Sequence, residues 1–423
     1  MSVKSVGTLV IGGGQAGIAM SEHLGRHGLP HLVVERDRIA ESWRSRRWDS
    51  LVANGPAWHD RFPGMKFPDA GDDDFISKEK VADYLVEYAR MIDAPIRSGV
   101  EVTSVVAAPE GHGFHVETSQ GPIVADNLVA ATGPFQRPVF PDMVPASEGV
   151  AQIHSQAYRN PGLLPEGAVL VVGAGSSGAQ IADELVRSGR EVYLCVGPHD
   201  RPPRRYRGKD FVWWLGVLGI WDLTTPAPNT EHVTIAVSGA HGGRTVDFRE
   251  FAARGITLLG RAVSFDGGAM RFAPDVRDNI ALGDENYLSM LRRADDYIAR
   301  NGLDFPEEPE AHEIGPMPAC VTDPILELDL KKAGITSIVW ATGYAPDFGW
   351  LKADAFDNRG RPVHKRGVSN VPGLYFLGLP WLSRRASSFI WGVWHDAAYL
   401  ADRIADAHRE TDAMPAAAAP SSV

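Results

Sequence analysis

Cysteine is nearly absent from this chain of 423 residues. The only two, Cys195 and Cys320, are far apart and form no Cys-x-x-Cys pair. Two isolated cysteines argue against a disulfide framework of the kind that stabilises small secreted domains. They also leave no cysteine pair for a thiol–disulfide relay, which excludes that mode of electron transfer.

Long hydrophobic runs are missing as well. The longest apolar stretch, VWWLGVLGIW at residues 212–221, is about half the length that a bilayer span requires. The opening residues, MSVKSVGTLVIGGG, run straight into an expected strand and lack the layout of a signal peptide. We therefore expect no integral membrane segment and a cytoplasmic location.

Positive charge is in deficit, because 53 acidic residues outnumber 42 basic ones and give a formal net charge of -11. This balance argues against nucleic acid as the main partner, although local basic clusters leave an anionic ligand open. No set of histidines and carboxylates has the spacing of metal ligands, so we expect no metal. The length exceeds the usual size of one hydrophobic core and favours two domains.

Glycine, in contrast, is placed in two informative motifs. The first is TLVIGGGQAG at residues 8–17, in which an apolar run is followed by Gly12, Gly14 and Gly17. In this spacing the first glycine permits a tight turn, the second lets a pyrophosphate approach the backbone, and the third lets helix and strand pack closely. Glu35 ends the next expected strand, HLVVE, where a carboxylate can accept both ribose hydroxyls of an adenosine. This combination predicts a dinucleotide-binding βαβ unit.

The second motif is VLVVGAGSSG at residues 169–178, with Gly173, Gly175 and Gly178 in the same spacing. Its second strand, EVYLCV, is followed by GPHDRPPRRYRGK and not by an acid. A carboxylate at that point would repel a 2′-phosphate, whereas arginine pairs with it, so the sequence favours NADPH over NADH. The candidate arginines are Arg201, Arg204 and Arg205; a solvated basic loop is the alternative interpretation.

These motifs together resemble the flavin-containing monooxygenases (class B flavoprotein monooxygenases), most closely the bacterial and plant branch that includes the auxin-forming enzymes. The identifying segment of that family is only partly kept, because EGVAQIHSQAYRNP has His154 and Tyr158 but lacks the phenylalanine. Gly149 stands five residues before the histidine and not four. The matching segments span nearly the whole chain: GGGQAG (12–17), ERDRIAESWRSRRWDSL (35–51), FPGMKFP (62–68), VAATG (129–133), GAGSSG (173–178), WATGY (340–344) and GLYFLG (373–378).

The resemblance implies an α/β fold with two Rossmann-like dinucleotide-binding domains, a discontinuous FAD domain and an inserted NADPH domain. The ATG segments would be the crossings between them, and the last strand and helix would complete the flavin site. The expected bounds are 1–160 with 325–410 for the FAD domain, 161–324 for the NADPH domain with an insertion at about 198–320, and a disordered tail at 411–423. We also expect helices at residues 77–92, near 285–300 and at the end to about 408.

The reaction implied by the resemblance is FAD-dependent, NADPH-consuming monooxygenation. Reduced flavin would take up molecular oxygen as a C4a-(hydro)peroxide and pass one oxygen atom to a nitrogen, a sulfur or a carbonyl carbon of a small organic substrate. A homodimer is left open. The rival interpretation is an FAD/NADPH oxidoreductase that passes electrons to a quinone or a protein acceptor without oxygen insertion, and a flavoprotein kept as a redox sensor is a further one.

Asn54 is the candidate catalytic residue, because its uncharged amide can donate a hydrogen bond to a peroxide oxygen near the flavin; a plain Asn54-Gly55-Pro56 turn is equally open. Arg44 is expected either to stabilise negative charge on the flavin or to lie at the surface. The full set of expected cofactor-binding residues is Gly12, Gly14, Gln15, Ala16, Gly17, Glu35, Arg36, Ser42, Trp43, Arg44, Trp48, Asn54, Thr132, Gly133, Gly173, Gly175, Ser176, Ser177, Gly178, Arg201, Arg204, Arg205, Ala341, Thr342, Gly343, Tyr344 and Gly378.

Three further features allow more than one interpretation. Residues 210–222, DFVWWLGVLGIWD, form a lid over the nicotinamide site, a dimer patch, a shallow membrane contact or a plain helical core. Aromatic residues near the C-terminus line a substrate pocket or only pack: Trp381, Phe389, Trp391 and Trp394. Isolated histidines are more typical of hydrogen-bonded structural residues than of acid–base catalysts, which applies to His59, His154 and His395.

Overall fold

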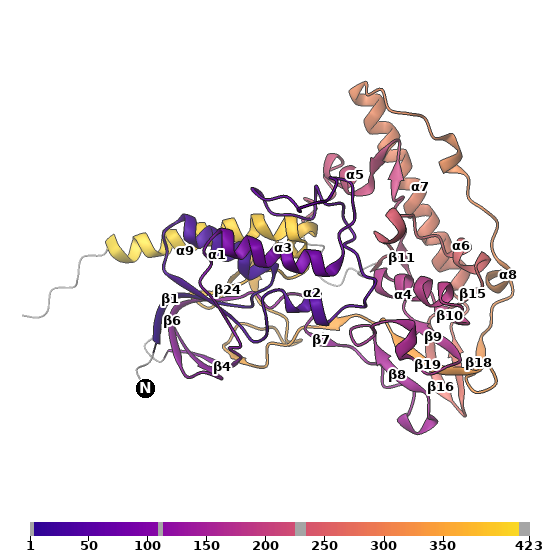
Figure 1. The fold of residues 1–423 in the computed structure, drawn as a ribbon, viewed down its shortest axis with the longest axis horizontal. Helices are drawn as coiled ribbons and strands as arrows, with labels where there is room; N and C mark the ends of the chain where they lie inside the picture. Colours follow the sequence, from indigo (N-terminus) through magenta and orange to yellow (C-terminus); the bar gives the residue numbers. More distant parts are fainter. Residues whose placement is uncertain (1–3, 109–112, 225–233, 414–423) are drawn as a thin grey trace, which may run out of the picture.

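The computed structural model describes residues 4–108, 113–224 and 234–413, with the backbone alone given for Thr234 and for residues 410–413. Figure 1 shows two α/β domains side by side, the N-terminal strands in one and the middle of the chain in the other. The α/β fold with two Rossmann-like domains is as predicted. Among the described residues, no helix is both long and apolar enough to cross a membrane.

The first domain is built on a mixed sheet whose centre is parallel. Strands β3, β2, β1, β6 and β24 lie in that order and pair in parallel, and β4 and β5 extend β6 as antiparallel neighbours. The apolar second half of β1 is buried at the centre of this sheet, with Leu9 and Val10 at 0% exposure. The strands of this sheet are β1 (Lys4–Ile11), β2 (His31–Glu35), β3 (Ile96–Ser98), β4 (Val102–Ala107), β5 (Phe114–Thr118), β6 (Ile123–Ala130), β21 (Leu351–Lys352), β22 (His364–Lys365), β23 (Val368–Ser369) and β24 (Leu374–Phe376).

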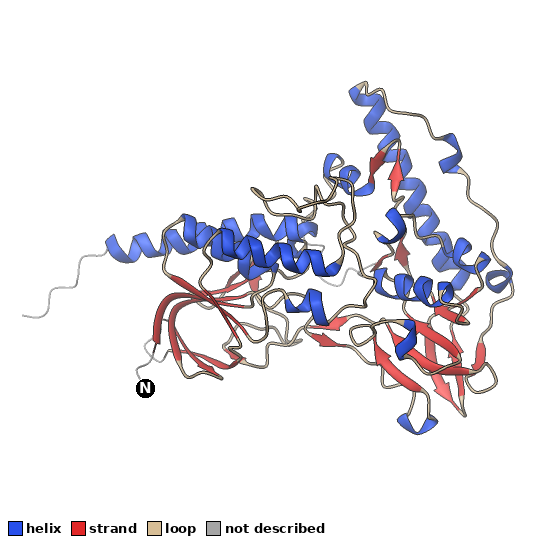
Figure 2. Ribbon diagram, in the orientation of Figure 1, coloured by secondary structure: helices blue, strands red, loops and turns tan. Residues whose placement is uncertain are grey.

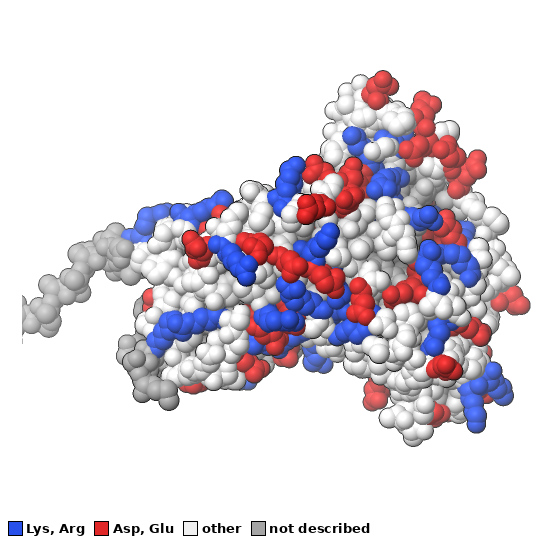
Figure 3. Space-filling model, in the orientation of Figure 1, with Lys and Arg blue, Asp and Glu red and all other residues white. Residues whose placement is uncertain are grey.

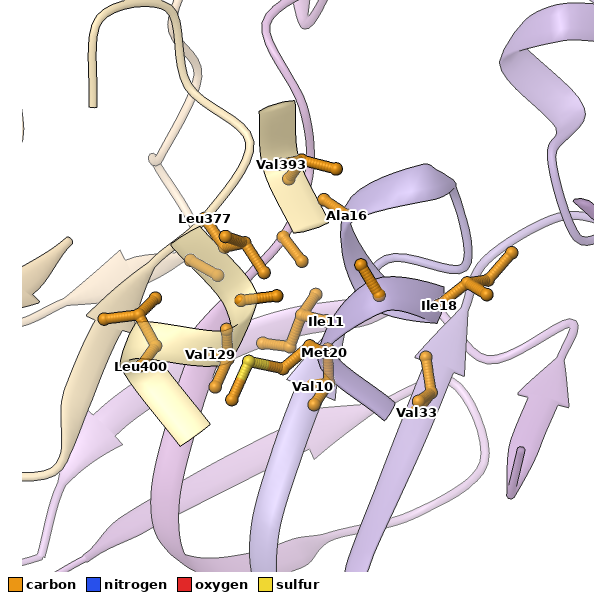
Figure 4. Packing of buried hydrophobic residues seen from close by; sticks show 14 of the residues in the cluster. Val10, Ile11, Ala16, Ile18, Met20, Val33, Val129, Leu377, Val393 and Leu400 are labelled. Atoms are coloured by element: carbon orange, nitrogen blue, oxygen red, sulfur yellow. The ribbon is translucent and has the colours of Figure 1, made fainter. Parts of the chain in front are cut away.

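Helices cover one face of this sheet, and the last helix lies alongside the first (Figures 1 and 2). Small residues near the start of α1 allow this close contact, and Figure 4 shows Ala16 and Met20 from α1 against Val393 and Leu400 from α9 above Val10 of β1. The predicted helix at 77–92 is confirmed, and Ser77 caps it by accepting a hydrogen bond from Lys80 N. The helices are α1 (Gln15–Arg26), α2 (Glu41–Ser45), α3 (Lys78–Met91) and α9 (Ile390–Ala413).

The second domain contains a wholly parallel sheet in the order β15, β10, β9, β19, β8. Its central strand β9 is buried along its whole length, as expected for a sheet with both faces covered. The strands are β8 (Ala151–His154), β9 (Ala168–Val172), β10 (Val192–Cys195), β15 (Ile256–Leu259) and β19 (Ile335–Trp340). The helices are α4 (Ser176–Arg187), α6 (Phe248–Ala253), α7 (Val276–Asn301) and α8 (Ala319–Thr322).

The sheet pairing corrects the expected domain bounds. Strand β8 falls in residues 1–160 and β19 in residues 325–410, both assigned to the first domain, yet both belong to the second sheet. Strand β15, expected within the insertion, is the edge of that sheet. The chain crosses between the domains twice, and the two crossings pair as the short antiparallel ribbon of β7 (Arg137–Pro138) and β20 (Tyr344–Ala345).

Short elements complete the second domain and the junctions. The tryptophan-rich segment forms α5 and packs inward: Trp214 is fully buried against α7, and Trp221 is 5% exposed. This packing supports the helical-core interpretation of residues 210–222. The remaining elements are β11 (His199–Asp200), β12 (Arg205–Tyr206), β13 (Lys209–Asp210), α5 (Phe211–Val217), β14 (Thr234–Ile235), β16 (Ala262–Asp266), β17 (Ala269–Phe272), β18 (Glu327–Asp329) and the 3-10 helices η1 (Ala146–Glu148), η2 (Pro161–Leu163), η3 (Ala240–Gly242), η4 (Pro309–His312) and η5 (Arg385–Ser388).

The C-terminal end differs from the expectation in one respect. Residues 411–413, expected in a disordered tail, belong to α9, and the rest of that tail, 414–423, lies outside the described residues.

Acidic and basic side chains are interspersed over both domains on the face shown in Figure 3.

Candidate cofactor cleft

One cleft of about 1500 Å³ runs between the two domains and is lined by both glycine motifs. Gly12 and Gly14 line it from the first domain, and Gly175 and Ser176 line it from the second. The N-termini of α1 and α4, which follow these motifs, therefore lie at the same cleft. Exposed backbone N–H groups at such helix ends attract phosphate groups.

The first motif has the geometry that a dinucleotide requires. Gly12 has a φ of +118°, and a side-chain Cβ at Gly17 would lie 1.9 Å from Gly12 O. A Cβ at Gly14 would meet nothing within 4 Å, which leaves the approach to the turn open. Glu35 lines the cleft, and its carboxylate accepts hydrogen bonds from Gly13 N (2.7 Å) and Asp37 N (2.9 Å). These residues fit an adenine dinucleotide such as FAD, whose ribose hydroxyls a carboxylate at the position of Glu35 can bind.

The second motif repeats this geometry. Gly173 has a φ of +104°, a Cβ at Gly178 would lie 1.7 Å from Gly173 O, and Gly175 is the N-cap of α4. Strand β10 ends at Cys195 without a carboxylate. The motif therefore fits a second dinucleotide whose ribose is recognised differently.

The arginines after β10 are not placed as the sequence interpretation expected. Arg201 is 4% exposed and donates to Asp247 and to Asp284, each at 3.0 Å. Arg204 is 2% exposed and donates to both carboxylate oxygens of Asp210 at 2.6 Å. Neither lines the cleft. The expectation of an open basic cluster is thus corrected for both, because acids from three other segments neutralise them inside the domain.

Arg205 and Arg44 are also away from the cleft. Arg205 is exposed and donates to Gly242 O at 3.1 Å. Arg44 pairs with Asp83 at 2.8 Å on the outer side of α3, which corrects its expected place beside the flavin and favours the surface alternative.

Most of the expected cofactor residues do meet in the cleft. Gly17 and Gly173 act behind its wall in the close packing described above, and Thr342 donates to Val139 O at the domain crossing. Those that line it are Gly12, Gly14, Gln15, Ala16, Glu35, Arg36, Ser42, Trp43, Trp48, Asn54, Thr132, Gly133, Gly175, Ser176, Ser177, Gly178, Ala341, Gly343, Tyr344 and Gly378.

Asn54 lines the cleft and is held by the second domain. Its Oδ1 accepts a hydrogen bond from Gln180 Nε2 of α4 at 3.0 Å, and its carbonyl oxygen accepts one from Arg204 at 2.7 Å. Within the described part of the chain, no residue accepts a hydrogen bond from Asn54 Nδ2. The amide is thus fixed through its oxygen and keeps its N–H groups for a ligand.

A polar residue that the sequence interpretation missed, Asp60, lies in the same wall. Its carboxylate accepts from Gly55 N at 3.0 Å, and His59 Nδ1 lies 2.7 Å from its Oδ1. The His59 ring is 5% exposed and stacks on Trp221, with 5.3 Å between ring centroids. His59 and Asp60 are adjacent in AWHDRFPG, and no spacing in this segment indicated that the aspartate lines the cleft.

The other candidate residues lie in the cleft, in the core or at the surface. His154 is 1% exposed, accepts from Gln156 N and contacts Gly343 O, and burial lowers its pKa, so it is a hydrogen-bonded structural residue. His395, by contrast, is exposed, with its ring against Trp391. Of the C-terminal aromatics, Trp381 and Phe389 line the cleft, whereas Trp391 and Trp394 do not.

Charge in the cleft comes mostly from residues that the sequence interpretation did not select. Arg46 and Arg47, one turn after the expected Trp43, line it together with Arg361 and Arg385. Arg47 lies 4.5 Å from the centre of the Phe135 ring. Burial lowers the Arg47 pKa, and the cation in turn opposes the rise that burial causes in the pKa of Tyr344. An RSRRW run in the sequence was the signal that could have found two of them.

Two dinucleotide motifs around one cleft define the class: a flavoprotein oxidoreductase of the two-dinucleotide type. A family model described as pyridine nucleotide-disulphide oxidoreductase matches residues 9–212. An uncharacterized CzcO-like oxidoreductase of Geobacillus kaustophilus is 35% identical over 404 residues, which cover 94% of this chain and 98% of that protein.

Comparisons with named monooxygenases narrow the class. The probable indole-3-pyruvate monooxygenase YUCCA4 of Arabidopsis thaliana is 26% identical over 416 residues, covering 95% of this chain and 90% of that one. The structure of a flavin-containing monooxygenase from Stenotrophomonas maltophilia superposes with a TM-score of 0.66 at 19% identity, over 96% of this chain and all of that one (100%). The chain belongs to the flavin-containing monooxygenase family, as its motifs predicted, and is a flavin monooxygenase-type oxidoreductase.

Proposed function

We propose that the protein is an NADPH-consuming, FAD-dependent monooxygenase that oxygenates a small organic substrate at nitrogen, sulfur or a carbonyl carbon. The reaction converts substrate, NADPH, O2 and a proton into oxygenated substrate, NADP+ and water. The observation that carries the proposal is the shared cleft, in which one motif is closed by Glu35 and the other lacks an acid. That arrangement supports two different dinucleotides in contact with one space.

When bound, FAD would supply the redox chemistry of hydride uptake and oxygen activation, which no side chain of this chain can supply. The chain's own residues hold and shield this chemistry. The turn at Gly14 and the N-terminus of α1 would take the flavin's pyrophosphate, and those at Gly175 and α4 would take that of NADPH. Trp43, Trp48 and Phe389 give the cleft apolar walls that limit access of water.

Asn54 is the residue we propose to act on the reacting oxygen. Its amide is oriented by Gln180 through Oδ1, so the N–H groups of Nδ2 are the donors left for the cleft. A neutral donor stabilises a developing negative charge on oxygen without offering a proton that would release hydrogen peroxide. The second domain therefore fixes a donor that serves the first domain's cofactor.

The test measures the fate of oxygen. With 18O2, NADPH and a panel that begins with indole-3-pyruvate, an organic sulfide and a tertiary amine, wild type should transfer one 18O atom to one of these substrates. Asn54→Ala should lower product formation about 100-fold, the usual cost of losing one oxyanion donor, and should raise hydrogen peroxide per NADPH. Asn301→Ala, at the exposed end of α7, is the matched control and should retain the wild-type ratio.

The rival function is electron transfer to a quinone or a protein acceptor without oxygen insertion, and the description of the matching family model favours it. That model's name implies disulfide chemistry, but burial raises the pKa of the Cys195 thiol and keeps it in its unreactive form. NADPH oxidation that requires added menadione, with no 18O in any product, would establish the rival and overturn the monooxygenase proposal. The cytoplasmic location and the homodimer stay predictions, to be checked by cell fractionation and light scattering.

A further inference from the structure

The arginines that follow the second dinucleotide motif in sequence do not line the cleft. Arg201 and Arg204 are neutralised by buried carboxylates, and Arg205 lies outside the cleft. A dinucleotide carries at least two negative charges on its pyrophosphate, and the N-terminus of one helix offers only partial positive charge. Among the described residues, a cation that pairs with a phosphate at the N-terminus of α4 must therefore come from another segment of the chain.

Arg385 of η5 is such a cation. It lines the cleft, and its side chain is 20% exposed. The nearest carboxylate oxygen, Asp200 Oδ2, is 3.9 Å away, beyond hydrogen-bond distance, and within the described residues no acceptor of a hydrogen bond from its guanidinium is found. Burial lowers the pKa of Arg385 more than Asp200 raises it, so the charge is incompletely compensated. A desolvated cation in this state gains stability from an anionic ligand.

The neighbour in sequence, Arg384, shows the contrast. Its guanidinium donates to Asp222 at 2.7 Å, and it does not line the cleft. The two adjacent arginines are similarly buried but differ in pairing. Arg384 meets its carboxylate at hydrogen-bond distance, whereas Arg385 lines the cleft with its carboxylate 3.9 Å away. This makes Arg384 a matched control for Arg385.

The backbone around Arg385 connects it to both helix N-termini. On one side, Ser388 O of η5 accepts a hydrogen bond from Gln15 Nε2, and Gln15 is the first residue of α1. On the other side, Asp200 belongs to β11, which pairs with β14, and Ile235 O of β14 accepts a hydrogen bond from Ser176, the first residue of α4. The hydrogen bonds in these connections are 2.9 Å and 2.8 Å long, and the second connection also includes the 3.9 Å separation between Arg385 and Asp200. Arg385 therefore lies between the two places where phosphates would bind.

We propose that Arg385 binds a phosphate of the nicotinamide dinucleotide held at the N-terminus of α4. Segment η5, near the far end of the sequence, thereby supplies the cation that the arginines after β10 cannot. A guanidinium donates two parallel hydrogen bonds to a phosphate, and the phosphate restores the charge balance that Asp200 leaves incomplete. The inference rests on the proposed use of NADPH and adds a residue to that site.

The experiment is calorimetric titration of the FAD-bound protein with NADP+, which needs no turnover. Arg385→Gln should weaken NADP+ binding about 10- to 100-fold, the usual effect of losing a charge-assisted hydrogen bond. Arg385→Lys keeps the charge and should recover part of the affinity, and it serves as the second variant if the glutamine substitution lowers FAD content. Arg384→Gln should bind NADP+ within about twofold of wild type.

The outcomes separate this inference from the proposed function. If wild type gives no heat with NADP+, the proposed use of NADPH fails. If wild type binds NADP+ and Arg385→Gln binds it equally well with full FAD content, the inference on Arg385 alone is wrong. A parallel titration with NAD+ identifies the phosphate: equal loss for both dinucleotides indicates the pyrophosphate, and loss for NADP+ alone indicates the 2′-phosphate.

Discussion

Removing the Arg204 side chain decides whether this arginine is a structural cation or a phosphate ligand. Its guanidinium donates to Asp210 through Nε (2.9 Å) and through a terminal nitrogen to both carboxylate oxygens, and it lies 4.5 Å from the centre of the Phe75 ring. In Arg204→Met the carboxylate of Asp210, itself 8% exposed, would stay buried without its cation. Breaking a buried pair in this way costs about 3–5 kcal/mol, so we expect the free energy of unfolding to fall by about that amount.

The assay is urea unfolding of the FAD-bound protein followed by tryptophan fluorescence. Asp210 also caps α5 by accepting from Val212 N at 3.0 Å, and asparagine keeps that acceptor. The double variant Arg204→Met/Asp210→Asn should therefore be more stable than the single variant by about 1–3 kcal/mol, because no charge is left unpaired. Arg205→Met is the exposed control and should change stability by less than about 0.5 kcal/mol.

One result would refute this reasoning. If Arg204→Met lost less than about 1 kcal/mol and instead raised the Kd for NADP+ while NAD+ binding was unchanged, Arg204 would be available to a ligand. The sequence interpretation of a 2′-phosphate site would then be restored, and the ion pair with Asp210 would be one state among others.

Two further predictions test packing and pH. Gly17→Ala should prevent folding of the first domain, because its Cβ would overlap Gly12 O at 1.9 Å, whereas Gly14→Ala should fold and lose FAD affinity, since nothing lies within 4 Å; circular dichroism and flavin content separate the two. Burial against Trp394 lowers the His23 pKa to about 4. The unfolded chain takes up a proton at His23 near the ordinary pKa value of 6.5, but the folded protein does so only near pH 4. The contribution of His23 to the free energy of unfolding is therefore complete above pH 6.5 and is lost as the pH falls from 6.5 toward about 4. Urea unfolding between pH 7 and 4 should show wild type losing more stability than His23→Gln, by up to about 3 kcal/mol; equal losses would contradict the shift.

The sequence predicted best what is local. Gly12, Gly14 and Gly17 lie within six positions, so their spacing fixes a turn whatever the rest of the chain does. Glu35 needs only the next strand in parallel register with the first, and that register places its carboxylate on Gly13 N. Most residues predicted this way line the cleft.

The interpretation of the arginine loop was wrong because the sequence does not show which acids fold onto it. Asp210, the partner of Arg204, is only six positions away, but the partners of Arg201 are distant. Asp247 and Asp284 follow Arg201 by 46 and 83 positions. A local reading of PPRRYR counts charges without the acids that fold onto them, and so predicts an exposed cluster. Arg385 was missed for the converse reason: in SRRASS nothing distinguishes the arginine that meets Asp222 from the one that faces the cleft.

The domain bounds were displaced for the same physical reason. Strand β8 pairs with β19 across more than 180 positions, with His154 opposite Trp340. The pattern of apolar residues identifies each strand but not the sheet that it joins, since both sheets are parallel at the centre and accept similar strands. Only the crossing ribbon of β7 and β20 shows where the chain leaves one sheet for the other.

Asn54 connects these observations, because the contacts that orient it come from the second domain. Gln180 Nε2 donates to Asn54 Oδ1 and also to Val237 O at 2.8 Å, so its own position is fixed within that domain. Arg204, tied to Asp210, donates to the Asn54 carbonyl oxygen. A rotation that separated the domains would break both bonds and leave the Asn54 amide free to turn. The orientation of the Asn54 amide and the closure of the cleft therefore change together. A variant that breaks the Arg204–Asp210 ion pair, such as Arg204→Met, should lower the amount of product formed per NADPH oxidised, although Arg204 does not line the cleft.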